Sequence, residues 1–230
     1  MGREFTKNMF IMLVTIMIGV VIITFFIADL KARSEEQERY TGEIEVIEQR
    51  NINFTNYFMK SSVLLDKARE DRAFGNYHFD LAFLWYQSAL SIKNDSLFEL
   101  YKIRGIENST NALPYYEYSH LNFEESGNYF LETKSLTTYP SYLEVLDIYI
   151  DLTASGSRLT ELRYTASTYL GYLTENLTFD FNNNNVTFQG NMTELLSMFD
   201  QIMFAIGAET EIFEGLQDEI DEYEFFDEIR

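Results

Sequence analysis

Two histidines, His78 and His120, are the only side chains of this sequence with an ordinary pKa near neutrality, so acid–base chemistry would start with them. His78 lies between a tyrosine and a phenylalanine, and His120 follows a serine. Neither has a nucleophile or a second ligand at the spacing of a known site. We therefore expect both to be structural residues whose ring nitrogens are satisfied by hydrogen bonds.

Carboxylates are far more abundant, with 37 Asp and Glu residues against 17 Lys and Arg. The densest cluster consists of Asp218, Glu219, Asp221 and Glu222. On a helix, three of these four share one face, where a divalent cation could find several oxygens. We expect a solvated acidic face instead, because such charge runs are usually hydrated.

Motifs that would bring in a cofactor are missing from the sequence. It contains no P-loop, glycine-rich dinucleotide motif, HExxH helix, EF-hand loop or Gly-x-Ser-x-Gly elbow. With no cysteine, structural disulfides, thiolate metal sites and a cysteine nucleophile are excluded. The net charge of −20 repels phosphate and argues against nucleic acid as a partner. We expect a non-enzymatic protein without a cofactor or a metal.

Aromatic side chains make up 16% of the chain and offer a different kind of site. Tyr115, Tyr116 and Tyr118, together with Trp85, could form a surface on which a sugar ring or a protein partner stacks. The alternative is that these rings fill the core with their hydroxyl groups at its margin, which is the more common use of tyrosine in a helical bundle. We keep the three tyrosines as the candidate interaction surface.

The clearest positioning element is an uncharged apolar run at residues 9–28. As a helix, about twenty residues span roughly 30 Å, the thickness of a bilayer's hydrocarbon core. A cleaved signal peptide is the alternative, but its apolar region is shorter and ends in a pair of small residues. We predict a transmembrane signal-anchor at 9–28, preceded by a short cytoplasmic tail at 1–8.

The orientation of this span rests on weaker signals. Lys and Arg number two on each flank, so the positive-inside rule is nearly silent. Six N-x-S/T acceptors are candidate glycosylation sites, and they begin at Asn53, Asn94, Asn108, Asn176, Asn185 and Asn191. They favour a single-pass protein of the cell membrane with the bulk of the chain extracytoplasmic.

The rest of the sequence indicates an all-α fold, because it has two prolines, 11 glycines and apolar residues at three- to four-residue spacing. We predict a stalk helix at 29–53 and an antiparallel helical bundle at 54–230 that ends in an acidic helix. An apolar seam should connect the two and consists of Ile44, Ile47, Phe54, Phe58, Leu65 and Ala68.

Several helix boundaries can also be predicted. Residues 96–99 have the form of a capping box, the polar stretch 107–111 should break a helix, and residues 155–157 should form a kink or turn. Pro114 and Pro140 each suit the first turn of a new helix. Residues 178–190, with four consecutive asparagines, could form a small hairpin; we favour an irregular loop, because an isolated hairpin is marginal in water.

One segment carries a resemblance to a known family. Gly75-Asn76-Tyr77, followed by Ala82, Tyr86 and Ala89, resembles the second helix of a tetratricopeptide repeat. The resemblance implies a turn at 75–77 and a packed helical hairpin, without an array of repeats. The whole chain resembles the single-pass, acidic, sequon-bearing surface proteins of archaea, a resemblance that carries no activity with it.

These observations leave three functional hypotheses. The first is a membrane-anchored extracytoplasmic protein that works by interaction or assembly with a protein partner or with copies of itself. The second is a ligand-binding or sensory ectodomain that acts through a membrane partner. The third, an extracytoplasmic hydrolase with paired carboxylates, rests only on the abundance of Asp and Glu.

Overall fold

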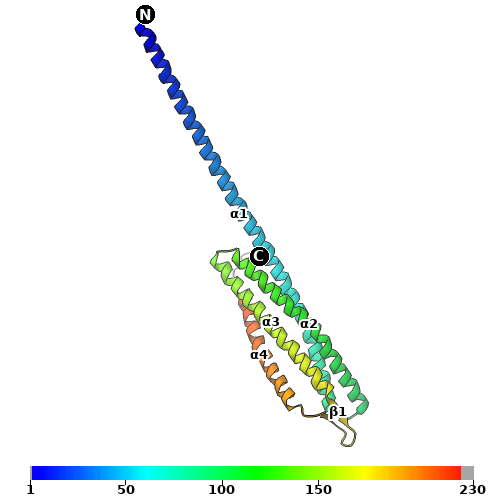
Figure 1. Cartoon of the computed structure of the whole chain (residues 1–230). Helices are drawn as coiled ribbons and strands as arrows, with labels where there is room; N and C mark the ends of the chain where they lie inside the picture. The colour runs from blue at the N-terminus through cyan, green and yellow to red at the C-terminus, as the bar shows by residue number, and fades with distance from the viewer. Residues whose placement is uncertain (1, 224–230) are drawn as a thin grey trace. The chain divides into compact units, whose positions relative to one another are not determined.

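The computed structural model describes the backbone of residues 2–223 and the side chains of residues 24–223. The prediction of an all-α fold is confirmed, because long helices form most of the described chain and a single hairpin forms its only sheet. In chain order (Figure 1) the elements are α1 (Gly2–Ser91), α2 (Asp95–Ser135), α3 (Pro140–Glu175), β1 (Leu177–Asp180), β2 (Asn185–Phe188) and α4 (Thr193–Asp221).

The chain divides into two compact units, Met1–Ile52 and Asn53–Arg230. Unit 1 holds the N-terminal part of α1. Unit 2 holds the rest of α1 with α2, α3, the hairpin and α4. Short loops join α1 to α2 and α2 to α3, the hairpin segment joins α3 to α4, and successive helices run antiparallel (Figure 1). Within unit 2, α3 lies between α2 and α4 (Figure 1).

The predicted membrane span at 9–28 falls mainly on residues 1–23, which lie outside the described side chains. Across the part of the chain that is described, no helix has a stretch both long and apolar enough to cross a membrane.

Unit 2 is held together by small residues that recur every seven positions, the repeat of helices packed side by side. On α1 and α2 the buried small residues are Ser61, Ala68, Gly75, Ala82 and Ala89, and Gly105, Ala112, Ser119, Ser126 and Thr133. Ser119 Oγ donates a hydrogen bond to the Ala68 carbonyl at 2.7 Å. One heptad further, Ser126 Oγ donates to the Ser61 carbonyl at 2.8 Å. A side chain this short reaches the next helix's backbone only because the two helices are very close.

Bulky residues occupy the neighbouring heptad positions and fill the space between the close contacts. The fully buried rings of Tyr116, Phe123 and Phe130 lie seven residues apart on α2. On α4 the repeat is Phe199, Ile206, Phe213 and Ile220. Each such side chain contributes roughly 1.5–3 kcal/mol through its removal from water. Alternating small and large residues therefore let the helices interlock.

The predicted break at 107–111 is wrong, because α2 runs through this segment and through Pro114. The polar side chains bond within their own helix: Ser109 Oγ donates to the Ile106 carbonyl and Asn108 Nδ2 to the Arg104 carbonyl. Pro114 lies on the exposed side of α2. The proline costs about 3 kcal/mol in a helix interior, and packing along the whole length of α2 offsets that cost.

Other boundary predictions gave mixed results. Pro140 does open α3, as expected. Asn94, and not the predicted capping box, caps α2: its side chain accepts a hydrogen bond from the Leu97 N–H at 3.2 Å. The turn expected at 75–77 is wrong, because this segment is helical. Residues 155–157 are also helical, so a turn is excluded there, whereas the alternative of a kink stays a prediction. Gly75 and Gly156 serve packing instead, since a Cβ on either would lie within 2.6 Å of a ring atom of the next helix.

The preferred irregular loop at 178–190 is also wrong, because β1 and β2 form an antiparallel hairpin there. Asn184, with a φ of 49°, supplies the left-handed residue of the turn. Leu177 and Val186 are buried, and Lys102 of α2 donates to the Leu177 carbonyl at 2.7 Å. Packing on α2 gives the hairpin the stability that an isolated one lacks.

Candidate functional site

Two arginines occupy heptad positions that are otherwise apolar. Arg72 on α1 lies seven residues from Leu65 and seven from Phe79, both of which are buried. Arg163 on α3 lies seven residues from Gly156 and seven from the buried Leu170. A charged residue in such a position is directed towards the core by the helix itself.

These arginines line a cleft of about 470 Å³ between α1, α3 and α4. Its lining residues are Arg72, Asn76, Leu159, Arg163, Thr210, Phe213, Glu214, Gln217 and Asp218. The Arg72 guanidinium lies 4.0 Å from the centre of the Phe213 ring, within cation–π range. The Arg163 guanidinium lies 5.5 Å from the centre of the Phe79 ring. Aromatic faces therefore hold both cations in place.

The guanidinium groups in this arginine cleft are incompletely paired. Nη1 of Arg72 and Nε of the neighbouring Arg69 are buried and have no hydrogen-bond partner. Among the described residues, no carboxylate oxygen lies within 4.0 Å of a charged nitrogen of Arg72 or Arg163. Burial, together with the charges of Arg69 and Arg163, lowers the pKa of Arg72 to about 10. Arg72 and Arg163 thus place two positive charges on the α1 and α3 sides of the cleft.

The α4 wall of the cleft is acidic and polar. Glu214 and Asp218 are one helical turn apart, with Gln217 beside them. On the α1 wall, the Tyr116 hydroxyl donates to Oδ1 of Asn76 at 3.0 Å. This bond leaves the Asn76 amide nitrogen as the group that can donate to a ligand. Burial raises the pKa of Tyr116, so its hydroxyl stays protonated as the donor.

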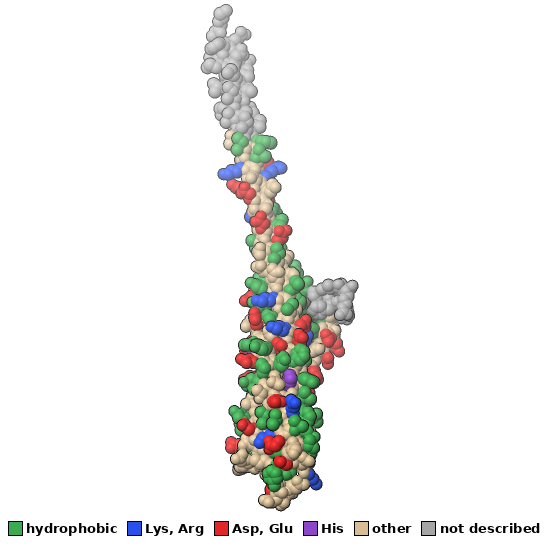
Figure 2. Space-filling view, turned by 90° about the vertical axis from the view of Figure 1, so that its right-hand side faces the viewer, with side chains coloured by type: hydrophobic (Ala, Val, Ile, Leu, Met, Phe, Trp, Pro, Cys, Tyr) green, Lys and Arg blue, Asp and Glu red, His purple; other side chains and the backbone are tan. Residues whose placement is uncertain are grey.

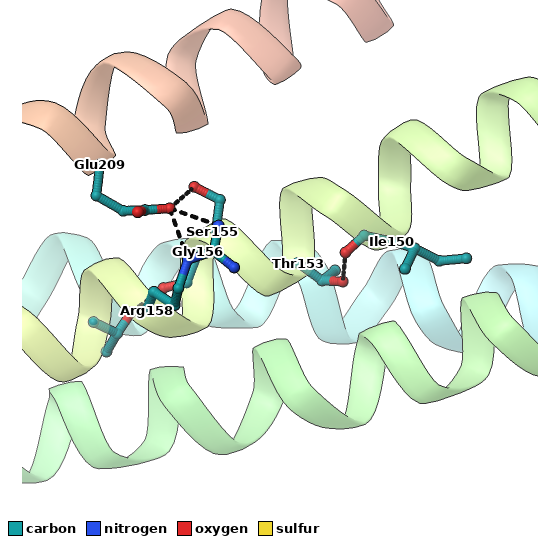
Figure 3. Close-up of polar contacts among 7 residues, drawn as sticks. Ile150, Thr153, Ser155, Gly156, Arg158 and Glu209 are labelled. Carbon is teal, nitrogen blue, oxygen red and sulfur yellow. Dashed lines mark hydrogen bonds and ion pairs between the residues drawn. The ribbon is translucent and has the colours of Figure 1, made fainter.

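A carboxylate joins α4 to α3 next to this cleft (Figure 3). Oε1 of Glu209 accepts from Ser155 Oγ at 2.6 Å and from Arg158 Nη2 at 2.9 Å. Burial raises the pKa of Glu209, but the Arg158 and Ser155 bonds outweigh it and hold the pKa below its ordinary value. Figure 3 shows the Glu209 side chain reaching from α4 to α3, where it fixes the position of α4 along the bundle.

His120 has partners on both ring nitrogens. Nδ1 lies 2.9 Å from Ser157 Oγ, and Nε2 lies 3.5 Å from Glu124 Oε1. A hydroxyl, an imidazole and a carboxylate in a row could in principle activate a nucleophile. However, Ser157 lies in the middle of α3, where the helix uses the backbone N–H groups that an oxyanion hole would need. The arrangement therefore supports a structural histidine.

His78 lies in an aromatic cluster on the outer side of α1 and α2. Its ring stacks on Tyr115 at 5.6 Å between centroids, and Nδ1 lies 3.3 Å from Asn108 Oδ1. Tyr115 also stacks on Phe74. On the face drawn in Figure 2, hydrophobic side chains are scattered among charged ones.

The candidate surface of three tyrosines is only partly a surface. Tyr118 is exposed and Tyr115 is half-buried, but Tyr116 is fully buried and belongs to the core. Helical geometry explains the difference, because Tyr116 alone of the three falls in the buried heptad frame. Trp85 does not join them and packs against Tyr101, with ring centroids 5.3 Å apart.

The acidic cluster at 218–222 lies at the C-terminal end of α4. All four of its carboxylate residues are exposed, and Asp218 faces the arginine cleft. Within the described part of the chain, no three Asp, Glu or His side chains converge in a way that could hold a metal ion.

The six candidate glycosylation residues differ in accessibility. Asn94, Asn185 and Asn191 are exposed, whereas Asn53, Asn108 and Asn176 are half-buried. The amide nitrogens of Asn108 and Asn176 also donate to carbonyls of their own helices. The geometry therefore favours the exposed three as acceptors.

The sequence analysis missed the arginine cleft, although it contained a signal. Arg72 and Arg163 interrupt apolar heptads, and a charge at such a position indicates a buried polar site. A comparison with known proteins adds no name, because no family model, curated protein or solved structure matches this chain.

Proposed function

We propose that the protein is a non-catalytic, single-pass membrane protein that displays its helical bundle outside the cell and works by assembling with another protein chain. The apolar run at 9–28 supports the anchor, and the six sequons support the orientation. The observation that carries the proposal is an apolar seam on the part of α1 in unit 1.

This unit 1 seam consists of Ile44 and Ile47, which begin the apolar seam predicted from the sequence, and of Tyr40, one helical turn before them. All three are exposed, Ile44 by 55% and Ile47 by 58%. The spacing between them is three or four residues. The same spacing continues along α1 to Ser61 and Leu65, which are buried in unit 2. A heptad frame with exposed apolar residues is typical of a helix that packs on a partner helix, and Asn51 is a polar position within this frame.

The charges beside the seam favour a different chain over a second copy. In a parallel pair of identical helices, Glu43 of one copy would face Glu48 of the other across the seam. Residues 29–52 carry seven acidic and four basic side chains. A helix with basic residues beside its own apolar seam would be complementary to this segment.

The test is to extract the full chain from its native membrane in mild detergent and to measure the mass and composition of the particle. We expect a particle with a stoichiometric helical companion. Replacing Ile44 and Ile47 with asparagine should release the companion, because two polar amides would then lie in the seam.

Val46→Asn is the matched control, because Val46 is 68% exposed but lies outside the heptad frame. Its particle should keep the companion. A wild-type monomer, or a companion retained by the Ile44 and Ile47 variant, would contradict the proposed function. A homodimer would show that the charge argument for a different chain is wrong.

Binding of a ligand by unit 2 is a second candidate function. The observation that favours it is the arginine cleft, whose polar groups converge from three helices.

A further inference from the structure

Among the residues that the structure describes, the two arginines of the arginine cleft are left without a direct ion pair, although the lining also holds two carboxylates. The chain has more than twice as many acidic as basic side chains. Nevertheless, Arg72 and Arg163 meet in one cleft without a direct ion pair among the described residues, and Arg69 stands one helical turn away. Burial, followed by the charges of Arg69 and Arg163, lowers the pKa of Arg72, and Glu214 opposes this shift.

Leaving a buried guanidinium nitrogen without an acceptor costs about 1–3 kcal/mol. Replacing Arg72 with an apolar residue would remove that cost and continue the heptad, so core packing does not account for the arginine. Nη1 itself has almost no accessible surface, so an oxyanion in the cleft would bond the parts of the Arg72 and Arg163 guanidinium groups that line it. A planar guanidinium suits a carboxylate well, because two parallel N–H groups can bond both of its oxygens.

The opposite wall discriminates between anions. Glu214 and Asp218 on α4 offset the charges of the two arginines, so the second negative charge of phosphate would gain no net attraction from the lining. Phe213 and Leu159 add apolar lining, which suits a ligand with a hydrocarbon part. The Asn76 amide nitrogen offers a further donor on the arginine side.

We propose that the arginine cleft of unit 2 binds a small organic carboxylate, held by Arg72 and Arg163 with its apolar part against Phe213. This site is independent of the seam in unit 1, so it can be tested whatever the outcome for the proposed assembly.

The experiment is calorimetric titration of the full chain in mild detergent with four probes. These are 4-methylpentanoate, its uncharged amide, L-leucine and inorganic phosphate. Leucine is 4-methylpentanoate with an added ammonium group, so this pair also reports whether the acidic α4 wall contacts a cation. We expect saturable binding of at least one of the two carboxylates, weaker binding of phosphate, and none of the amide.

Variants separate a binding site from a structural one. Arg163→Gln should weaken carboxylate binding by about tenfold or more, the loss expected for a charge-assisted bond. Glu214→Gln should strengthen it severalfold, because a repelling charge is removed, and a purely structural role would not produce this gain. Arg104→Gln is the control, since Arg104 is exposed and pairs with Glu107 on α2. Arg72→Gln is informative only if circular dichroism shows that it folds, so Arg163 and Glu214 carry the test.

Absence of carboxylate binding in both the wild type and the Glu214 variant would overturn the proposal. So would binding that the Arg163 variant leaves unchanged, or equal binding of the amide.

Discussion

At the scale of single residues, small side chains determine how closely the helices of unit 2 approach. Gly75 is the clearest case, because a Cβ at this position would lie 2.6 Å from Cε1 of Tyr116. Tyr116 is fully buried and bonded to Asn76, so its ring has little room to move. The absent Cβ is therefore a packing requirement, although glycine is intrinsically unfavourable in a helix.

Gly75→Ala should destabilise unit 2 by about 1–3 kcal/mol, because overpacking outweighs the gain in helix propensity. Gly215→Ala is the matched control on α4, where nothing lies within 4 Å of the new Cβ. The control should stabilise the protein by about 0.5–1 kcal/mol. Urea unfolding followed by circular dichroism measures both changes, and a gain of stability in the Gly75 variant would contradict the close approach of α1 and α2.

Residue roles were predicted from the sequence only in part. Both ring nitrogens of His120 have partners, whereas His78 has one at Nδ1, and the structural role of the two histidines stays a prediction. Tyr116 belonged to the candidate interaction surface but is buried, so for this residue the alternative of core filling is confirmed; the heptad frame of α2 was not recognised. The frame was hidden because serine, threonine and glycine, which look polar or flexible in the sequence, occupy core positions where helices nearly touch.

At the scale of elements, α4 depends on a polar link to α3. Glu209 binds Ser155 and Arg158, and these bonds keep its folded pKa below the ordinary value of 4.5. A carboxylate with a lowered pKa contributes stability that is fully present above its unfolded pKa. That contribution is lost as the pH falls through the folded pKa.

Glu209→Gln should therefore lower stability by about 1 kcal/mol at pH 7. The difference from the wild type should shrink below pH 4.5, as the wild-type carboxylate takes up its proton. Unfolding free energies measured between pH 7 and the acid limit of folding give this difference. Glu211→Gln, an exposed site on the same helix, should show little effect at any pH. A Glu209 difference that does not change with pH would contradict the ionic link.

At the scale of the whole molecule, the proposed orientation places unit 2 outside the cell. The hairpin acceptor Asn185 is exposed, whereas Asn108 is half-buried within α2. If unit 2 is outside, a glycan should be found on Asn185, and Asn185→Gln should remove its mass. Asn108→Gln should leave the glycan mass unchanged. Mass spectrometry of glycopeptides from native membranes makes both measurements.

A reagent that modifies amines and does not cross membranes gives an independent readout on intact cells. Lys67 and Lys93, both exposed in unit 2, should react with it. If no acceptor asparagine is modified and these lysines react only in opened cells, the orientation is reversed.

The sequence by itself determined the helical character of this protein, because few breakers and regular apolar spacing act locally along each segment. For the same reason it placed the start of α3 at Pro140. Tertiary structure alone decided that α1 and α2 run unbroken through Gly75 and Pro114, since contacts with neighbouring helices offset unfavourable local residues. It also brought together Arg72, Arg163 and Glu214. These residues lie on three different helices, far apart in the sequence, and they meet only because the helices pack in this register.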